Sequence, residues 1–172
     1  TVGASGAIFG VLAATLVAAS PAAAVPSDTT PIACDSCDGW NAPHAPFRLH
    51  GDSYYVGVEG ISAVLIATPD GLILLDGGLP QSVAPISANI RALGFRVEDI
   101  QWILVSHAHY DHVGGVAAFA RLSGGKVGAS VAGARALRAG APPSDDPQGT
   151  PPYDVPFPAV KAVVEIADGG TI

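Results

Sequence analysis

The stretch "SHAHYDH" (residues 106–112) holds three of the chain's five histidines, and an aspartate, within seven positions. It directly follows "IQWILV" (100–105), an apolar run whose length is typical of a buried strand. Three imidazoles this close would repel one another on protonation, and they are costly to desolvate without a cation to organise them. The stretch therefore predicts a strand that ends in a metal-binding turn, rather than a loop with ordinary histidines.

The spacing within this turn favours two metal ions. His107 and His109 are two residues apart at a strand end, so their side chains can leave the backbone on the same side and reach one ion. Asp111 and His112 come after the chain has begun to turn, and six residues cannot easily wrap four side chains round a single tetrahedral zinc. Neutral imidazole and carboxylate suit Zn²⁺, and a catalytic zinc keeps three protein ligands and a water.

The segments before the histidines predict an antiparallel start to a sheet. "FRLHGDSYYVGV" (47–58) and "AVLIATPDGLILLDGG" (63–78) each read as a β-hairpin, the second with its turn at residues 69–71. The continuous apolar runs 64–67 and 72–75 predict strands that are buried on both faces.

From residue 81 onward the pattern alternates between helices and strands. "QSVAPISANIRALGF" (81–95) shows helical spacing of apolar residues, with Pro85 in the first turn. The remaining expected elements are a strand at 100–105, a helix within 114–125, a strand at 126–129, a helix at 131–139, a proline-rich loop at 141–158 and a last strand at 160–167. Hairpins followed by this alternation predict an α+β fold of mixed sheets with helices outside.

Length and charge limit the classes of function. A chain of 172 residues is long enough for one domain with a hydrophobic core, and one domain is the default. The net charge is −7, with eight Lys and Arg and no basic run. Binding to a phosphate backbone needs clustered positive charge, so nucleic acid is not an expected partner.

The N-terminal residues predict export. The chain begins with Thr1 rather than Met, and we expect its true start to be missing. "AIFGVLAATLVAA" (7–19) is followed by Ala22 and Ala24, which fit a small-x-small cleavage rule, so residues 1–24 read as a signal peptide. A membrane anchor would need about 20 apolar residues. We expect a periplasmic or secreted protein that is free of the membrane after cleavage, with residues 25–46 as an N-terminal surface segment.

Cys34 and Cys37 lie just after the expected cleavage site, in a compartment that favours disulfides. Zinc binding by this pair would need two more ligands, and a thioredoxin-like motif would need a flanking strand and helix. The pair is interpreted as a structural disulfide or as an incidental pair.

"SHAHYDHVGG" (106–115) resembles the H-x-H-x-D-H signature of the metallo-β-lactamase superfamily, which glyoxalases, lactonases and nucleases share. The longer stretch from "PFRLHGDSYYVGVEGISAVLIATPDG" (46–71) to the histidines is similar to the third subclass of metallo-β-lactamases, as are "DDPQ" (145–148) and Trp40. The resemblance covers roughly residues 38–172. It implies an αββα sandwich with the metals at one edge between two sheets, of which residues 47–172 are the N-terminal half.

The resemblance also implies roles for single residues. His107 and His109 would bind the first of two zinc ions, and Asp111 and His112 the second, while the family takes one further histidine per ion from later in the chain. Asp76 would support the metal loop without binding an ion. The loops that flank the substrate would contain Trp40 and residues 153–157. The other two histidines, His44 and His50, precede the core strands and are expected to be ordinary loop histidines.

The function so implied is zinc-dependent hydrolysis of the β-lactam ring of antibiotics by the complete protein, with Asp111 also orienting the attacking water. The 172 residues alone are expected to be inactive and poorly soluble. The alternative is a hydrolase of the same fold that acts on another ester, lactone or thioester. The chain has neither S-x-x-K with its partner motifs nor a G-x-S-x-G elbow, so a serine-dependent hydrolase lacks support. The oligomeric state stays open.

Overall fold

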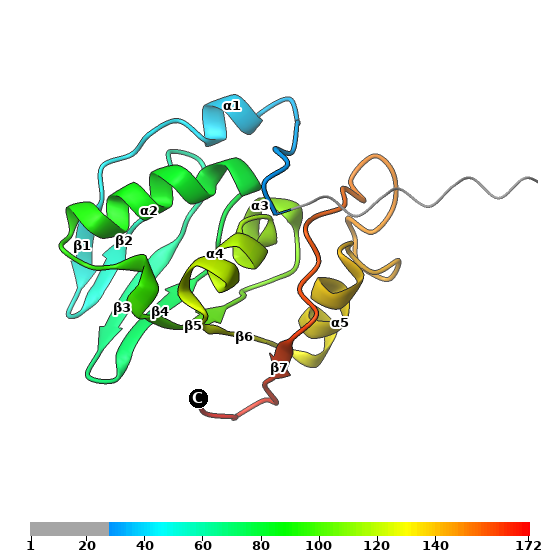
Figure 1. The fold of residues 1–172 in the computed structure, drawn as a ribbon. Coiled ribbons are helices and arrows are strands. Elements are labelled where there is room, and N and C mark those ends of the chain that lie inside the picture. Colours follow the sequence, from blue (N-terminus) through cyan, green and yellow to red (C-terminus); the bar gives the residue numbers. More distant parts are fainter. Residues whose placement is uncertain (1–27) are drawn as a thin grey trace, which may run out of the picture.

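The computed structural model describes residues 28–172, so the expected signal peptide at 1–24 lies outside the described residues. These residues form a seven-stranded mixed sheet whose spatial order follows the chain, from β1 to β7 (Figure 1). Helices pack along the sheet, as the α+β prediction required. In the span from residue 28 onward, no helix is both long enough and apolar enough to cross a membrane.

The first four strands are antiparallel. They are β1 (Phe47–His50), β2 (Ser53–Tyr55), β3 (Val64–Thr68) and β4 (Gly71–Leu75). Both predicted hairpins are confirmed. The β3–β4 turn falls where "PDG" was expected, because Gly71 adopts a φ of 133° that L side chains rarely reach and closes the ladder opposite Thr68.

The last three strands run parallel to β4. They are β5 (Ile100–Leu104), β6 (Lys126–Ala129) and β7 (Val163–Glu165), and they alternate with α2 (Val83–Ala92), α4 (Val116–Ser123) and α5 (Val131–Ala139). Short 3-10 turns precede α2 (η1, Pro80–Ser82) and β5 (η2, Val97–Asp99). Each of these helices joins two neighbouring parallel strands. Because such crossovers are almost always right-handed, successive helices lie on one face of the sheet. The predicted strand at 160–167 is shorter than expected, because Val160 N–H donates to Leu137 O on α5 instead of joining the ladder.

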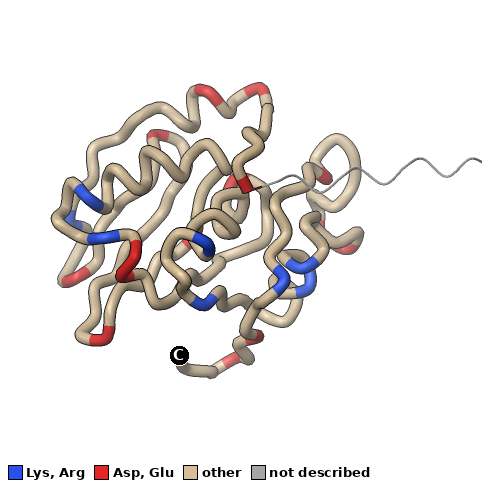
Figure 2. The backbone as a smooth tube through the Cα atoms, viewed as in Figure 1, with Lys and Arg blue, Asp and Glu red and all other residues tan. Residues whose placement is uncertain are grey.

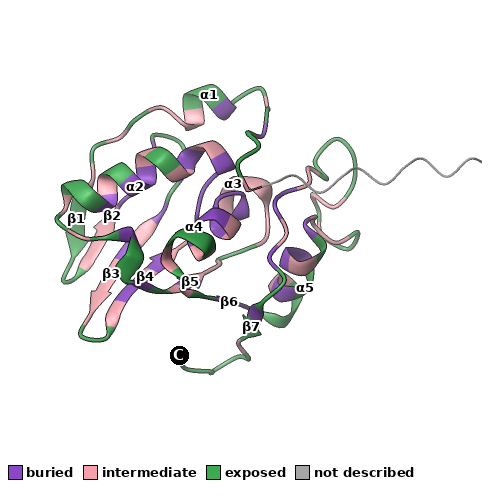
Figure 3. Cartoon of the chain, viewed as in Figure 1, coloured by how far each residue is buried: buried purple, intermediate pink, exposed green. Residues whose placement is uncertain are grey.

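The core lies between the helices and the sheet (Figure 3). Leu65, Leu74 and Ile103 from the strands and Ile86 and Phe119 from the helices are all fully buried. The expectation that strands 64–67 and 72–75 are buried on both faces is not met within the part of the fold that the chain spans. In β4 the burial alternates along the strand, with buried and half-buried positions in turn, because the helices pack against one face of it.

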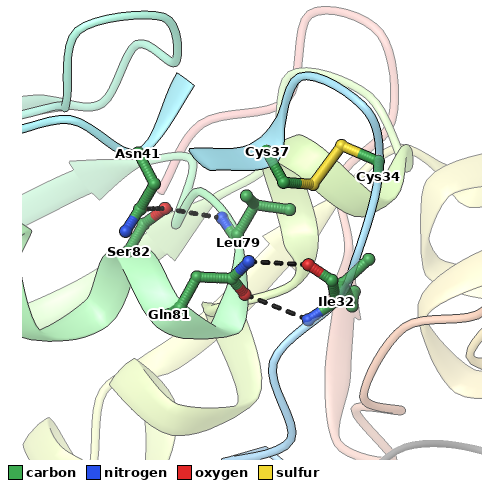
Figure 4. The surroundings of a disulfide bond; sticks show 7 residues. All are labelled: Ile32, Cys34, Cys37, Asn41, Leu79, Gln81 and Ser82. Carbon is green, nitrogen blue, oxygen red and sulfur yellow. Dashed lines mark hydrogen bonds between the residues drawn. A yellow bond between two sulfur atoms is a disulfide. The ribbon is translucent and has the colours of Figure 1, made fainter. Parts of the chain in front are cut away.

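The N-terminal segment is tied down by a disulfide and by side-chain hydrogen bonds (Figure 4). Cys34 and Cys37 are bridged, which settles the alternative that the sequence left open, and Cys37 begins the one-turn helix α1 (Cys37–Trp40). Gln81 bonds both backbone groups of Ile32: its Nε2 donates to the carbonyl at 2.7 Å and its Oε1 accepts from the N–H at 3.1 Å. Most side chains between residues 28 and 46 are exposed or half-buried, whereas Ile32 and Cys37 reach the core.

The charged side chains are dispersed over the surface. Figure 2 shows the Lys and Arg positions spread over several separate elements rather than gathered on one face.

Candidate functional site

The predicted metal-binding turn joins β5 to the short helix α3 (Tyr110–Val113), at the carboxyl end of the parallel strands (Figure 1). The ring centroid of His107 lies 4.6 Å from that of His109 and 4.0 Å from that of His112. Asp111 lies on α3, and its Oδ2 is 3.5 Å from Nε2 of His112. The structure therefore brings together all four residues that the sequence selected.

Two glycine pairs fix the position of this turn. Gly77 N–H donates to His112 O at 2.8 Å, and Gly115 N–H donates to Gly78 O at 2.9 Å. A Cβ atom on Gly115 would lie 2.2 Å from Gly77 O, closer than any side chain tolerates. The "GG" after β4 and the "GG" after α3 therefore pack backbone to backbone, and the histidine turn is docked on the end of β4.

Asp76 links these two segments from within the protein. It is 5% exposed, and its φ of 62° is a left-handed value that aspartate tolerates better than most residues. Its Oδ1 accepts from Ser106 N–H at 2.8 Å, and its Oδ2 accepts from Ser106 Oγ at 2.6 Å and from His112 Nδ1 at 2.9 Å. These bonds agree with the supporting role expected for Asp76.

A second carboxylate was missed by the sequence reasoning. Asp146, in the proline-rich loop, lies with its Oδ1 2.9 Å from Nε2 of His109. The backbone N–H of Gln148 and the bond to His109 both hold the pKa of Asp146 below its usual value. The "DDPQ" segment carried the only sequence signal for this contact, and a separation of 37 residues hides it from local patterns.

The hydrogen bonds leave one nitrogen of each imidazole available. Nδ1 of His107 is 3.0 Å from Ser106 Oγ, Nε2 of His109 faces Asp146, and Nδ1 of His112 faces Asp76. A histidine that ligates a metal commonly bonds a carboxylate or another oxygen through its second nitrogen, which fixes the tautomer and the ring orientation. This donor set fits a divalent ion such as zinc.

The described residues do not complete a metal site by themselves. Between residues 28 and 172, no group of three or more His, Cys, Asp or Glu side chains stands in an arrangement that could hold an ion. His44 and His50 do not supply a further ligand. His44 bonds Ala45 O through Nδ1 and packs against Phe47 and Tyr55, and His50 is exposed on β1.

The electrostatics distinguish two of the histidines. Burial, helped by the neighbouring His112 and His109, lowers the pKa of His107 below its ordinary value. Burial also acts to lower the pKa of His112, but the hydrogen bond to Asp76 and the charges of Asp111 and Asp76 together outweigh it and raise that pKa. At neutral pH His107 is therefore the better disposed of the two to offer a neutral imidazole to a metal.

A cleft of ≈ 530 Å³ opens over the turn. His107, His109 and Asp111 line it, and its walls include Trp40 from α1 and Tyr153 from the proline-rich loop. Both aromatic residues were expected to flank a substrate. Phe157, from the same expected loop, is instead fully buried in the core.

A family model described as the metallo-beta-lactamase superfamily matches residues 56–172. The chain belongs to this superfamily. Its solved structural neighbours include a B3 metallo-beta-lactamase with an active-site glutamic acid (46% identity, TM-score 0.79, covering 84% of this chain and 53% of that one). They also include the Rm3 metallo-beta-lactamase (47% identity, TM-score 0.75, covering 81% of this chain and 51% of that one).

A curated relative is a UPF0173 metal-dependent hydrolase from Anaeromyxobacter sp. (strain K), 38% identical over 69 residues, which are 40% of this chain and 24% of the relative. The chain thus spans about half of the structures it matches and about a quarter of this hydrolase. The seven-stranded sheet with its helices is the part of the metallo-beta-lactamase fold that the chain covers.

Proposed function

We propose that the complete protein is a zinc-dependent hydrolase that opens the β-lactam ring of antibiotics. The observation that carries the proposal is the meeting of His107, His109, Asp111 and His112 at the end of β5, each imidazole with one nitrogen held by an oxygen partner. The B3 structural neighbours, at 46–47% identity over most of the chain, support the β-lactam ring as the substrate.

We assign His107 and His109 to one zinc ion, and Asp111 and His112 to a second. A catalytic zinc uses three protein ligands, so each ion needs one more. We place those ligands in the part of a complete domain that the chain does not span. Bound zinc supplies a nucleophilic water at neutral pH and polarises the carbonyl that this water attacks.

The chain's own residues then have separate tasks. The carboxylate of Asp111 accepts a hydrogen bond from the attacking water and so orients it. Asp76 and Asp146 hold the rings of His112 and His109 in place, through bonds of 2.9 Å each. Trp40 and Tyr153 bound the cleft, and their apolar faces position the substrate and exclude bulk water.

We further propose that the protein is exported and acts in the periplasm or outside the cell. The apolar run at 7–19 and the small residues that follow it support a signal peptide. The Cys34–Cys37 disulfide supports an oxidising compartment, since such bonds are rare where thiols are kept reduced.

The second candidate is a hydrolase of another ester, lactone or thioester. The relative from Anaeromyxobacter favours it, because that protein carries the general description of a metal-dependent hydrolase. Its match covers only 40% of this chain, compared with 84% for the first B3 structure, so we rank it second.

The test is a substrate panel with the complete protein. We expect hydrolysis of a chromogenic cephalosporin, its loss on treatment with a chelator and its return with added zinc. Turnover of a lactone or a thioester, with the cephalosporin left intact, would replace the first candidate by the second. The 172-residue chain alone is expected to cleave none of them.

A further inference from the structure

The Cys34–Cys37 bridge lies beside the cleft. The four-residue ring that it closes contributes Cys34, Asp35 and Ser36 to the cleft wall that also contains Trp40. Cys37, at the other end of the bridge (Figure 4), is only 3% exposed and packs in the core. The ring therefore has one side in the core and the other on the cleft.

The ring and Trp40 are connected by a single turn of helix. Cys37 N–H donates to Cys34 O at 3.1 Å within the ring, and Trp40 N–H donates to Ser36 O at 2.8 Å. Cys37 is the first residue of α1 and Trp40 is its last. The N-cap residue Ser36 makes no side-chain capping bond. A helix of one turn is not stable by itself, so its start must be held by other means.

The end of this helix is held separately. Ser82 Oγ donates to Asn41 Oδ1 at 2.6 Å, and Gly60 N–H donates to Trp40 O at 3.0 Å. The indole packs directly on Gly60, where a Cβ atom would lie 2.5 Å from Cδ1 of Trp40. The position of Trp40 is thus set by the disulfide ring at the start of α1 and by Gly60 and Ser82 at its end.

We propose that Cys34–Cys37 is a positioning disulfide, which fixes α1 so that Trp40 forms a rigid wall of the substrate cleft. The expected change in substrate binding rests on the proposed function, whereas the positioning of Trp40 by the bridge does not. Among the described residues, no hydrogen bond joins Cys34 or Cys37 to the histidines of the turn or to Asp111. Loss of the bridge therefore weakens substrate binding through Trp40 and leaves the metal ligands in place.

The test uses the double variant Cys34→Ala/Cys37→Ala in the complete protein. Alanine avoids a buried hydroxyl at position 37, and replacing both cysteines avoids a lone thiolate in the cleft, where it could itself bind zinc. We expect backbone amide exchange of Trp40 and Asn41 to become at least about tenfold faster. We expect KM for the cephalosporin to rise about fivefold, with kcat within about twofold and the zinc content unchanged.

Two further variants keep the inference falsifiable. In a Trp40→Ala background, loss of the bridge should raise KM no further, because the two changes act through one side chain. If the double variant does not fold, Gly60→Ala displaces the indole while the bridge stays intact, and it should raise KM to a similar extent. Ser130→Ala, which removes the N-cap bond of α5, is the control for a general loss of stability and should leave KM unchanged.

Unchanged exchange of Trp40 and Asn41 in the double variant would overturn the inference, as would an additive effect in the Trp40→Ala background. A fall in zinc content together with kcat would also overturn it, because the bridge would then support the metal loop. If the wild-type protein cleaves no β-lactam, the proposed function fails, and the exchange measurement still decides whether the bridge positions Trp40.

Discussion

Nδ1 of His112 donates a hydrogen bond of 2.9 Å to Oδ2 of Asp76, a residue 36 positions earlier in the chain. The same carboxylate accepts both the N–H and the Oγ–H of Ser106, which directly precedes the first histidine of the turn. One buried side chain thus holds both ends of the histidine turn and connects it to the end of β4.

Asp76→Asn should weaken metal binding without unfolding the protein. Asparagine tolerates the φ of 62° at this position, but its amide group cannot accept all three hydrogen bonds. Loss of a partner that orients a ligating histidine typically costs about 10- to 100-fold in metal affinity, and we expect a zinc titration of the complete protein to show a loss in this range. Asp70→Asn, in the exposed β3–β4 turn, is the matched control, and equal affinities for the two variants would contradict the supporting role.

The stability of the metal-free protein should depend on pH through His112. Its pKa is raised in the folded state, so its contribution is fully present below the unfolded value of about 6.5 and is lost as the pH rises through the folded value. The difference in unfolding free energy between wild type and Asp76→Asn should therefore be larger at about pH 5.5 than at about pH 8.5. Urea denaturation in the presence of a chelator measures it, and a difference that grows toward high pH would show that the sign is wrong.

Gly115→Ala should destabilise the fold, since the added Cβ would meet Gly77 O at 2.2 Å and force the two glycine pairs apart. Overpacking of this kind costs about 1–3 kcal/mol in unfolding free energy, and chemical denaturation of the complete protein would measure it. Gly39→Ala is the control, because its Cβ would meet nothing within 4 Å. If both variants unfold at the same denaturant concentration, the close packing of the two loops does not contribute to stability.

Much of the fold could be predicted because it depends on sequence patterns that act over a few neighbouring residues. The "PDG" turn, the proline in the first turn of α2 and the glycine that ends α4 each act within a few residues, and the elements appear where these signals place them. The four candidate ligands were also found from sequence, because they lie within six consecutive residues.

The contacts that organise the site could not be found this way, because they join distant positions. The bond between His109 and Asp146, and the one between Gln81 and Ile32, depend on how the loops fold back over the sheet. The half-burial of one face of β4 in the described residues could not be predicted for a similar reason. An apolar run shows that side chains can be buried, but only the packed layers decide which face is covered.

The measurement that tests the two-metal centre most directly is the zinc content of the complete protein and of its Asp111→Ala variant, determined together with the rate of cephalosporin hydrolysis. We expect about two zinc ions per wild-type domain and about one in the variant, with a rate at least about 100-fold lower because an ion and the group that orients the water are lost together. A wild-type protein that takes up no zinc, or an Asp111→Ala variant that keeps the wild-type rate, would contradict this assignment.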